Sequence, residues 1–347
     1  MPTPFTVMTW NVENLFPPGS FTGPNSPPVA QADFEAKIDT LSNFILGFAE
    51  QPDIIALQEV GGQNDADMRS FDALQQALGG IYDNRAVSGE PDSRHIRVAF
   101  ISKLPLLNPA DIKDFPSGPM ESVRDFNSVR TAMGRGALKV EVEPLPGVRV
   151  RLVTTHLKSK LLTFPRPGGG TSFSTQDEDI RAFAAGIALH RRAAEAVTVR
   201  AFLTAEMEAD PTMHTIVLGD MNDGPLAATS QVFLGPADAD IKSDDQFDSV
   251  RLFNLVDAVP VRGPFWHTFL DEAQAPHFTR IHDGRGEVLD HIMASKKLIV
   301  PDSEFAVEVR IFNELTADQN VGYNPTARLG VAVPDHAPVM ARFELPD

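Results

Sequence analysis

The stretch PDIIALQEV, residues 52–60, places a carboxylate at the end of an apolar strand. Its apolar run, residues 54–57, has the length and β-branched content of a buried strand. Gln58 and Glu59 follow directly, so Glu59 is expected where the strand leaves the core. A carboxylate there is costly unless it is paired or bound to a metal ion. A salt bridge to one of the arginines is the alternative to a functional role.

Similar apolar runs recur along the chain and predict the strands of a mixed α/β protein. Each is short and rich in β-branched residues, and Pro/Gly-rich segments at 17–28, 108–119 and 165–175 are interpreted as loop excursions within a single domain covering residues 1–347. The predicted strands cover residues 5–10, 54–57, 96–101, 137–142, 148–155, 215–218, 288–294 and 339–343.

Three helices are predicted between these strands. The first carries a stripe at helical spacing, Phe34, Ile38, Leu41, Ile45 and Phe48. The second opens with a capping-box pattern, TQDE at 175–178, and extends to about residue 207. Its expected buried face is Ile180, Phe183, Ile187, Ala194, Val197 and Ala201. A weaker third helix covers residues 68–78.

Composition limits the possible functions. The chain has 347 residues, of which 42% are hydrophobic. It has no apolar run long enough to span a bilayer and no signal-peptide pattern, so a cytoplasmic protein is expected. It has no cysteine, which excludes disulfides, thiolate zinc sites and cysteine nucleophiles. A net charge of −17 argues against tight sequence-independent nucleic-acid binding. It does not exclude a nuclease, because a bound cation reverses the local electrostatics.

Polar side chains follow several of the predicted strands. Asp220 and Asn222 stand two residues apart after the run at 215–218, so they project to the same face, and Gly219 and Gly224 permit a sharp turn. The pair can bind a hard cation or orient a water, although an Asx turn closing the strand is the alternative. Strand ends are where open sheets assemble sites.

Two of the nine histidines are candidates for chemistry. His156 follows the strand predicted at 148–155, and His336 has Asp335 before it and Asp290 at another strand end to orient its ring. No Gly-x-Ser-x-Gly elbow and no phosphate-binding P-loop motif is present, which argues against serine acyl transfer and P-loop chemistry. Carboxylates and amides with a histidine fit a Mg²⁺- or Mn²⁺-bound phosphate ester.

Six segments, in this order along nearly the whole chain, resemble the motifs of the endonuclease/exonuclease/phosphatase superfamily: TWNVENL, PDIIALQEV, TTHLKSK, VLGDMND, LDHIMAS and PDHAPVMARF. The resemblance implies the deoxyribonuclease I-like fold. This fold is a four-layer α/β/β/α sandwich of two packed mixed β-sheets flanked by helices. Its site lies at one end, between the sheets.

The resemblance also implies a role for each matching residue. Glu59 is expected to be the principal metal ligand, with Asn11 and Asp335 close to the same ion. Asp220 is expected to position or deprotonate the attacking water, and Asn222 to hold that water or a phosphate oxygen. Mg²⁺ or Mn²⁺ is the expected cofactor, with Ca²⁺ as a further option.

The two histidines complete the implied catalytic set. His336, oriented by Asp290, is expected to contact the scissile phosphate and stabilise the charge that develops there. His156 matches the second histidine of the nuclease-like branch. In-line attack of water on a phosphodiester needs a placed nucleophile and donors on the nonbridging oxygens, and no covalent intermediate.

Four basic residues are predicted to bind substrate phosphate: Arg94, Arg135, Lys158 and Lys160. The first two fall where many bacterial members of the superfamily have an arginine, and the lysines belong to HLKSK. Ordinary surface charges or partners for the excess acid are the alternative. Arg97 stands where those relatives often have an acidic or amide residue, which leaves its role open.

The motif variants favour the bacterial nuclease-like branch. Inositol-phosphate phosphatases of the superfamily typically follow Gly-Asp with Leu-Asn-Tyr-Arg, and abasic-site endonucleases usually have Ile-Asp-Tyr, where this chain has GDMND and LDHI. We therefore expect a metal-dependent hydrolase of phosphodiester bonds in nucleic acid or nucleotides, of endonuclease or exonuclease type. The alternatives are a phosphatase or phospholipase C-like hydrolase of a small or lipid phosphoester, and a binding module without turnover. No protein partner is indicated.

Two further expectations concern loops. The loop from Pro165 to Thr175, which contains the glycine run at 168–170, is predicted to be a mobile flap over the substrate groove, with a plain tether to the second helix as the alternative. Glu13 and Asn14, which follow Asn11 in TWNVENL, are predicted to shape the turn into the next loop.

Overall fold

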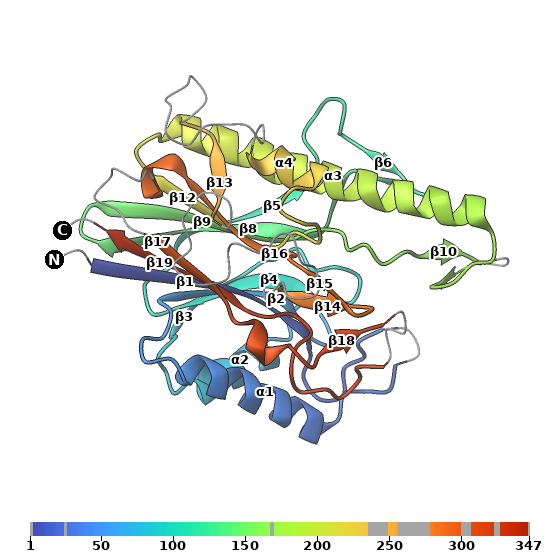
Figure 1. The fold of residues 1–347 in the computed structure, drawn as a ribbon, viewed down its shortest axis with the longest axis horizontal. Helices are drawn as coiled ribbons and strands as arrows, with labels where there is room; N and C mark the ends of the chain where they lie inside the picture. The colour runs from blue at the N-terminus through green and yellow to red at the C-terminus, as the bar shows by residue number, and fades with distance from the viewer. Residues whose placement is uncertain are drawn as a thin grey trace.

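The computed structural model describes residues 3–23, 26–166, 170–234, 249–255, 278–299, 307–322 and 327–345. Two six-stranded mixed sheets pack face to face, and helices cover the outer face of each (Figure 1). The predicted four-layer sandwich is confirmed. No helix in the described part of the chain is both long enough and apolar enough to cross a membrane.

Each large sheet combines parallel and antiparallel pairs. In spatial order, the first contains β17 (Val307–Ile311), β19 (Val339–Leu345), β1 (Thr3–Leu15), β2 (Ile54–Val60), β4 (Arg97–Ser102) and β3 (Asn84–Val87). The second contains β13 (Leu252–Asn254), β16 (Asp290–Ser295), β12 (His214–Asp220), β9 (Val148–His156), β8 (Ala132–Leu145) and β5 (Leu107–Asp114).

Three smaller sheets lie outside these layers. They are β6 (Val123–Arg124) with β7 (Val129–Arg130), β10 (Phe164–Pro165) with β11 (Thr171–Ser172), and β15 (Arg285–Glu287), β14 (Arg280–His282) and β18 (Asn320–Val321). The helices are α1 (Gln31–Leu46), α2 (Arg69–Ala77), α3 (Glu178–Ala209) and α4 (Ala228–Leu234), with short 3-10 turns η1 (Lys296–Leu298) and η2 (Asn313–Leu315).

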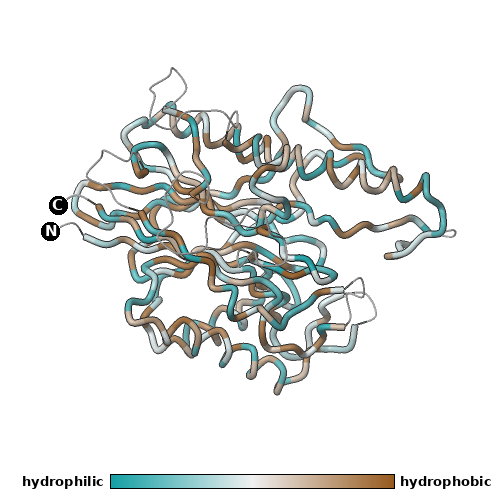
Figure 2. The backbone as a smooth tube through the Cα atoms, viewed as in Figure 1, coloured by the Kyte–Doolittle hydropathy of each residue, from teal (hydrophilic) through white to brown (hydrophobic). Residues whose placement is uncertain are grey.

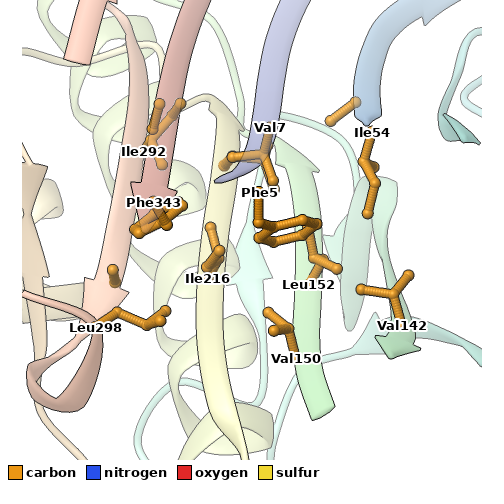
Figure 3. Packing of buried hydrophobic residues seen from close by; sticks show 14 of the residues in the cluster. Phe5, Val7, Ile54, Val142, Val150, Leu152, Ile216, Ile292, Leu298 and Phe343 are labelled. Atoms are coloured by element: carbon orange, nitrogen blue, oxygen red, sulfur yellow. The ribbon is translucent and has the colours of Figure 1, made fainter. Parts of the chain in front are cut away.

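Alternation along β1 explains why its sequence is apolar without interruption. Phe5 and Val7 face the second sheet, while Met8, Trp10 and Val12 face the helices below the first. A strand buried on both faces needs apolar residues at successive positions. Figure 3 shows the layer between the sheets, where Phe5 and Val7 lie beside side chains from the opposite sheet. Figure 2 shows apolar residues concentrated along the central strands.

Each of the eight predicted strand runs overlaps a strand, although residues 96, 288 and 289 lie outside, and the three predicted helices correspond to α1, α3 and α2. The expected stripe of α1 is confirmed for Phe34, Ile38, Leu41 and Ile45, which are buried, whereas Phe48 follows the end of the helix and is partly buried. One loop expectation was incomplete. Residues 107–114, placed mostly in a Pro/Gly-rich excursion, form the edge strand β5, whose pairing with β8 is irregular at two points.

The predicted buried face of α3 was wrong for most of its residues. Ala194 is buried as expected, but Phe183 is 65% exposed and Ala201 is also exposed, while Ala184, Ala188 and Leu203 are buried. The helix packs through small residues, which allow its backbone to approach the neighbouring elements closely. Its N-terminal half extends beyond the sheets (Figure 1), so large apolar residues there have no sheet to cover them. Its N-cap is Asp177, whose carboxylate accepts a hydrogen bond from the backbone of Ile180.

Candidate active site

Strand register brings three of the predicted site residues into one row. On the second sheet, Asp220 of β12 pairs with His156 of parallel β9 on one side and with Asp290 of antiparallel β16 on the other. Asp220 and His156 are the last residues of the parallel strands β12 and β9, and Asp290 is the first residue of the antiparallel strand β16. All three therefore lie at the same edge of the sheet. The first sheet meets the same edge with Asn11 of β1, which pairs with Gln58 of β2.

Backbone strain is concentrated at this edge. Four residues near it have positive φ: Glu13 (47°), Asn14 (53°), Glu59 (65°) and Asn222 (52°). Non-glycine residues adopt such angles at an energetic cost, and they cluster at functional sites. The pairing register between β2 and β4 shifts between Leu57 and Val60. Glu59 lies in this irregularity and therefore departs from the regular alternation of the strand.

His336 lies between two carboxylates. Its Nδ1 donates to Asp290 Oδ2 at 2.7 Å, and its Nε2 is 3.9 Å from Asp220 Oδ2. Trp10 Nε1 donates to the backbone carbonyl of His336 at 2.9 Å. Burial by itself would lower the pKa of His336, but Asp290, Asp335 and Asp220 together raise it to about 10. The ring is therefore an imidazolium at neutral pH.

Asp220 is held by two amide donors. Asn11 Nδ2 donates to its Oδ2 at 3.0 Å, and the backbone N–H of Asn222 donates to its Oδ1 at 2.8 Å. Burial raises the pKa of Asp220 to about 7, with the charge of His336 opposing and that of Asp290 adding to the rise. A carboxylate with a pKa near neutrality can accept a proton from water. The side chain of Asn222 donates to the carbonyl of Leu157 at 2.9 Å.

His156 differs from His336 in charge. Its Nε2 lies 3.3 Å from Asp220 Oδ2, and Nη1 of Arg135 lies 2.8 Å from its Nδ1. Burial, together with the positive charges of Arg135 and His336, lowers the pKa of His156 well below its usual value. His156 is therefore a neutral imidazole. Arg135 is held by Asp92, which accepts a hydrogen bond from its Nε at 3.1 Å.

The carboxylates on the first-sheet side form a second group. Glu59 Oε2 accepts a hydrogen bond from the backbone of Asn14 at 3.1 Å, and its Oε1 is 3.9 Å from both Arg135 Nη1 and His156 Nε2. Asp335 Oδ2 accepts from Arg280 Nε at 3.2 Å. Burial would raise the pKa of Asp335, but the charges of His336 and Arg280 hold it below its usual value.

The predicted turn at Glu13 and Asn14 was wrong. Both residues lie within β1, which continues to Leu15, and their positive φ angles fall where its pairing with β2 is irregular. The carboxylate of Glu13 also accepts hydrogen bonds from Arg328 Nε at 2.7 Å and from the backbone of Asp335 at 3.0 Å. It therefore ties β1 to the loop that carries Asp335 and His336. Burial, with the charge of Asp335, raises the pKa of Glu13 to about 7.

The site residues open into one cavity of about 1170 Å³. All twelve predicted site residues except Asp290 line it, and Asp290 lies behind His336. The cavity wall is strongly cationic on the α3 side. There, Lys158, Lys160 and Arg135 are joined by residues that sequence reasoning did not select, among them Arg130, Arg181 and Arg191.

The predicted phosphate-binding residues have different surroundings. Lys158 Nζ donates to the carbonyls of Ser159 and Leu161 at 2.8 and 2.9 Å. Lys160 Nζ is 3.2 Å from Glu287 Oε1. Arg94 donates to Asn14 Oδ1 at 3.3 Å and to the carbonyl of Thr22 at 3.2 Å. Arg97, whose role was open, is buried and donates to the backbone carbonyls of Ser88 and Asp65.

Helix α3 supplies side chains that support the site and that the sequence did not indicate. Glu195 is 2% exposed, and its carboxylate accepts hydrogen bonds from the backbones of Gly134 and Lys158 at 3.0 and 2.6 Å. Arg192 donates to the carbonyl of Lys158 at 3.1 Å and to Asp223 at 3.2 Å. The sequence feature that could have indicated Glu195 is its i,i+4 spacing from Arg191 on the helix, where the two form a charged pair. Residues 167–169 of the predicted flap, Pro165–Thr175, lie outside the described residues, so the flap stays a prediction.

The donor set fits a hard divalent cation. Carboxylate and amide oxygens are the ligands that Mg²⁺ and Mn²⁺ prefer. One group of donors converges in the described part of the chain: Asp220, Asp290 and His336, whose ligand atoms lie within 4.8 Å of one another. In this group His336 is an imidazolium and has no lone pair for a metal, so we interpret it as an ion-paired triad. The predicted metal ligands Asn11, Glu59 and Asp335 line the same cavity and carry amide and carboxylate oxygens.

Comparison with known proteins agrees with this geometry. The chain belongs to the Endonuclease/Exonuclease/phosphatase family, whose sequence model matches residues 8–307. The family consists of hydrolytic phosphoesterases and nucleases that depend on a divalent metal. No curated protein matches the sequence.

Solved structures show the shared fold. The human Nocturnin catalytic domain with bound sulfate is 18% identical, with a TM-score of 0.53, and the alignment covers 99% of this chain and 95% of that one. A truncated TDP2 from Caenorhabditis elegans is 17% identical, with a TM-score of 0.52 and 98% coverage of both chains. A family member from Bacteroides thetaiotaomicron is 12% identical, with a TM-score of 0.50 and 100% coverage of both.

Proposed function

We propose that the protein is a divalent-metal-dependent phosphodiesterase that hydrolyses phosphodiester bonds in nucleic acid or nucleotides. The observation that carries the proposal is the row of His156, Asp220 and Asp290 on three adjacent strands, with His336 ion-paired to Asp290, at the end of a cavity with cationic walls. This row combines an acceptor for a proton from water with a donor for a phosphate oxygen.

Asp220 is the proposed general base. Its raised pKa, about 7, matches the requirement that a base accept a proton near neutral pH. Asn11 and Asn222 orient its two oxygens through the hydrogen bonds described above. Asn222 is also proposed to hold the water or a phosphate oxygen. A water positioned by Asp220 would attack phosphorus in line with the leaving oxygen.

His336 is the proposed electrostatic stabiliser. Its Nδ1–H is engaged by Asp290, so its Nε2–H is directed elsewhere and can donate to a nonbridging oxygen of the phosphate. A fixed charged donor requires little reorganisation as negative charge develops. His156, neutral and adjacent to Asp220, is proposed to accept or donate a single hydrogen bond to the substrate.

Glu59, Asp335 and Asn11 are the residues proposed to hold the divalent cation. When bound, the ion would supply Lewis-acid stabilisation of the phosphate oxygens. The remaining substrate is proposed to run along the cationic wall, where Arg94, Arg135, Lys158 and Lys160 would contact flanking phosphates. An extended anionic substrate fits this wall better than an isolated monoester does, which favours nucleic acid or nucleotides over a small phosphoester.

A substrate panel tests the proposal. Purified protein with Mg²⁺, Mn²⁺ or EDTA is offered bis-p-nitrophenyl phosphate, p-nitrophenyl phosphate, plasmid DNA, RNA and sphingomyelin. We expect cleavage of the diester and of a nucleic acid, abolished by EDTA. Turnover of the monoester or the lipid alone would establish the alternative phosphatase or phospholipase C-like activity. Metal binding without turnover of any substrate would indicate a binding module.

A matched pair of histidine variants tests the assigned roles. His336→Gln should lower kcat by roughly 10²- to 10³-fold, because the charged donor is lost. The control variant His291→Gln makes the same substitution at a buried histidine of β16. The ring of His291 contacts Asn254 and the carbonyl of Val288. We expect this control to retain kcat. Equal losses in both variants would contradict a catalytic role for His336 and point to folding.

A further inference from the structure

Asp92 is an acidic residue of the cavity wall to which the proposed hydrolysis assigns no role. It lies in the connection between β3 and β4 of the first sheet, and it lines the cavity beside Arg94. Its side chain is only 17% exposed. The sequence did not single it out, because an aspartate in DSRHIRV, residues 92–98, is typical of a turn. In the structure, however, its two carboxylate oxygens have different partners.

One oxygen of Asp92 closes the turn. Its Oδ1 accepts hydrogen bonds from the backbone N–H groups of Arg94 at 2.8 Å and of Ile96 at 3.1 Å. The backbone N–H of Asp92 donates in turn to the carbonyl of Ile96 at 2.9 Å. This local role uses one oxygen and needs no negative charge, because the side-chain carbonyl of an asparagine could accept the same two hydrogen bonds.

The other oxygen lies beside two arginines. Asp92 Oδ2 accepts a hydrogen bond from Arg135 Nε at 3.1 Å and lies 3.7 Å from Arg94 Nε. Arg94 belongs to the same connection as Asp92, whereas Arg135 belongs to β8 of the second sheet. One carboxylate oxygen therefore holds guanidinium groups from both sheets next to each other. Without its charge, the two cations would repel each other.

The remaining contacts of the two arginines leave donors unused. Nη1 of Arg94 donates to Asn14 Oδ1 and to the carbonyl of Thr22, and Nη1 of Arg135 lies against the ring of His156. Among the residues that the structure describes, none accepts a hydrogen bond from Nη2 of either arginine. Both arginines line the cavity, so these donors remain for a phosphate group, which arginine binds through charge-assisted hydrogen bonds.

The arginine pair lies beside the row of proposed catalytic residues rather than within it. His156 separates Arg135 from the proposed general base, since its ring lies 2.8 Å from Arg135 Nη1 and 3.3 Å from Asp220 Oδ2. A phosphate held by the arginines would therefore be one side chain away from the attacking water. This position suits a neighbouring phosphate of the substrate better than the phosphate that is attacked.

We propose that Asp92 is a positioning residue, which through Oδ2 holds Arg94 and Arg135 together as one subsite for a substrate phosphate that flanks the scissile one. The inference rests on the proposed function, because it requires hydrolysis of a substrate with more than one phosphate. Asp92 acts through the two arginines and does not touch the substrate. Its effect is therefore expected on substrate affinity and not on the chemical step.

The test compares a substrate that has flanking phosphates with one that has none. The full chain with Mg²⁺ is offered a short single-stranded oligonucleotide, made as DNA and as RNA, and bis-p-nitrophenyl phosphate. Asp92→Asn keeps an acceptor for the turn but replaces Oδ2 with an amide group that cannot accept from arginine. We expect this change to raise KM for the oligonucleotide roughly tenfold, with kcat within about twofold. Both constants for bis-p-nitrophenyl phosphate should stay within about twofold of native.

Two further measurements identify the cause. Asp111→Asn is the matched control: the carboxylate of Asp111 accepts a hydrogen bond from the backbone of Gly89, in the same connection as Asp92, and within the described ranges it contacts neither arginine. It should keep the native KM. In an Arg94→Met/Arg135→Met background, Asp92→Asn should raise KM no further, because the groups through which Asp92 acts are absent. A further rise in that background would overturn the inference.

The outcomes separate the two proposals. A native KM for the oligonucleotide in Asp92→Asn, or an equal rise for both kinds of substrate, would overturn the inference and leave the proposed function intact. Cleavage of bis-p-nitrophenyl phosphate alone by the native protein would also overturn it, because no flanking phosphate would be used. Absence of turnover of all these substrates by the native protein would instead remove the basis of the proposed function. Circular dichroism establishes that each variant is folded, and Asp92→Ser, whose hydroxyl can also accept from the turn, serves if Asp92→Asn is not.

Discussion

Lys158 shows how one side chain links the chemistry of the cavity to pH. Burial lowers its pKa to about 8, with the charges of Arg191 and Arg135 adding to the effect and that of Glu195 opposing it. Its ammonium group donates to backbone carbonyls of its own loop, so it is already positioned when substrate arrives. The charge that would attract a phosphate is therefore present below about pH 8 and lost above it.

We expect KM for a polyanionic substrate to rise as pH increases through about 8, by roughly three- to tenfold, because Lys158 becomes neutral. The rise should be absent in Lys158→Met, with kcat little changed, while Lys103→Met should behave as the native protein. A KM rise that persists in Lys158→Met would contradict the assignment.

The same lowered pKa affects stability. Between about pH 8 and 10.5, Lys158 carries a proton in the unfolded chain but not in the folded protein. The contribution of Lys158 to the free energy of unfolding therefore increases with pH in that window.

Residue identity alone located the candidate residues. Asn11, Glu59 and Asp220 were selected because they follow apolar runs, and all three line the cavity together with His336, which was selected for its neighbouring carboxylates. The charge states could not be predicted in this way. Two histidines of the same intrinsic pKa become an imidazolium at 336 and a neutral ring at 156, because carboxylates surround the first and an arginine lies against the second.

At the scale of elements, the contact between β9 and β12 positions the row of His156, Asp220 and Asp290, the residues proposed for catalysis. Gly219 has φ of 148°, and a Cβ there would lie 2.0 Å from the carbonyl oxygen of Thr155 on β9. Only glycine allows the two strands to approach so closely at this point. The register that pairs Asp220 with His156 therefore depends on a residue without a side chain.

Gly219→Ala should lower the free energy of unfolding by roughly 3 kcal/mol and also reduce turnover, because the strands must separate. Gly186→Ala is the control in α3, where an added Cβ meets no atom within 4 Å. That change should raise stability by about 0.5–1 kcal/mol, since alanine is the better helix former. Urea unfolding measures both, and similar effects in the two variants would refute the close-approach argument.

Element type was predictable, but element orientation was less so. Periodicity located α1 and α3, yet it assigned α3 the wrong face, because Phe183 and Ile187 dominate the apolar count. Burial follows the small residues Ala184 and Ala188 instead. Which face of α3 is buried depends on how far the neighbouring sheet extends along the helix. The local sequence of the helix contains no information about the extent of the sheet.

At the scale of the molecule, charge is divided between surface and cavity. The chain has a net charge of −17, while arginines and lysines from β8, α3 and the loop after β9 line one wall of the cavity. A polyanion is repelled by most of the surface and accommodated at this wall. Association with a polyanionic substrate should therefore depend on this local patch and on bound cation rather than on net charge.

Metal binding at the proposed ligands Asn11, Glu59 and Asp335 should stabilise the fold. At a Mg²⁺ concentration of about 100 times Kd, the free energy of unfolding should rise by about 2.7 kcal/mol, because the ion binds the folded state alone. Thermal unfolding with Mg²⁺ and with EDTA measures this shift. Glu59→Gln should remove most of it, and Glu35→Gln, an exposed position on α1, should retain it. An unchanged shift in Glu59→Gln would mean that the ion binds elsewhere.

The sequence by itself determined the family and the four-layer fold, through the six motifs that resemble the superfamily, and it located the candidate site residues at the ends of apolar runs. Tertiary structure alone decided which of those side chains touch, how they are charged, and that Glu13 and Glu195 support the loops that carry them. The physical reason is that charge and contact depend on distances between strands far apart in the chain. PDIIALQEV predicts a carboxylate at a strand end, but only the facing sheet determines what that carboxylate meets.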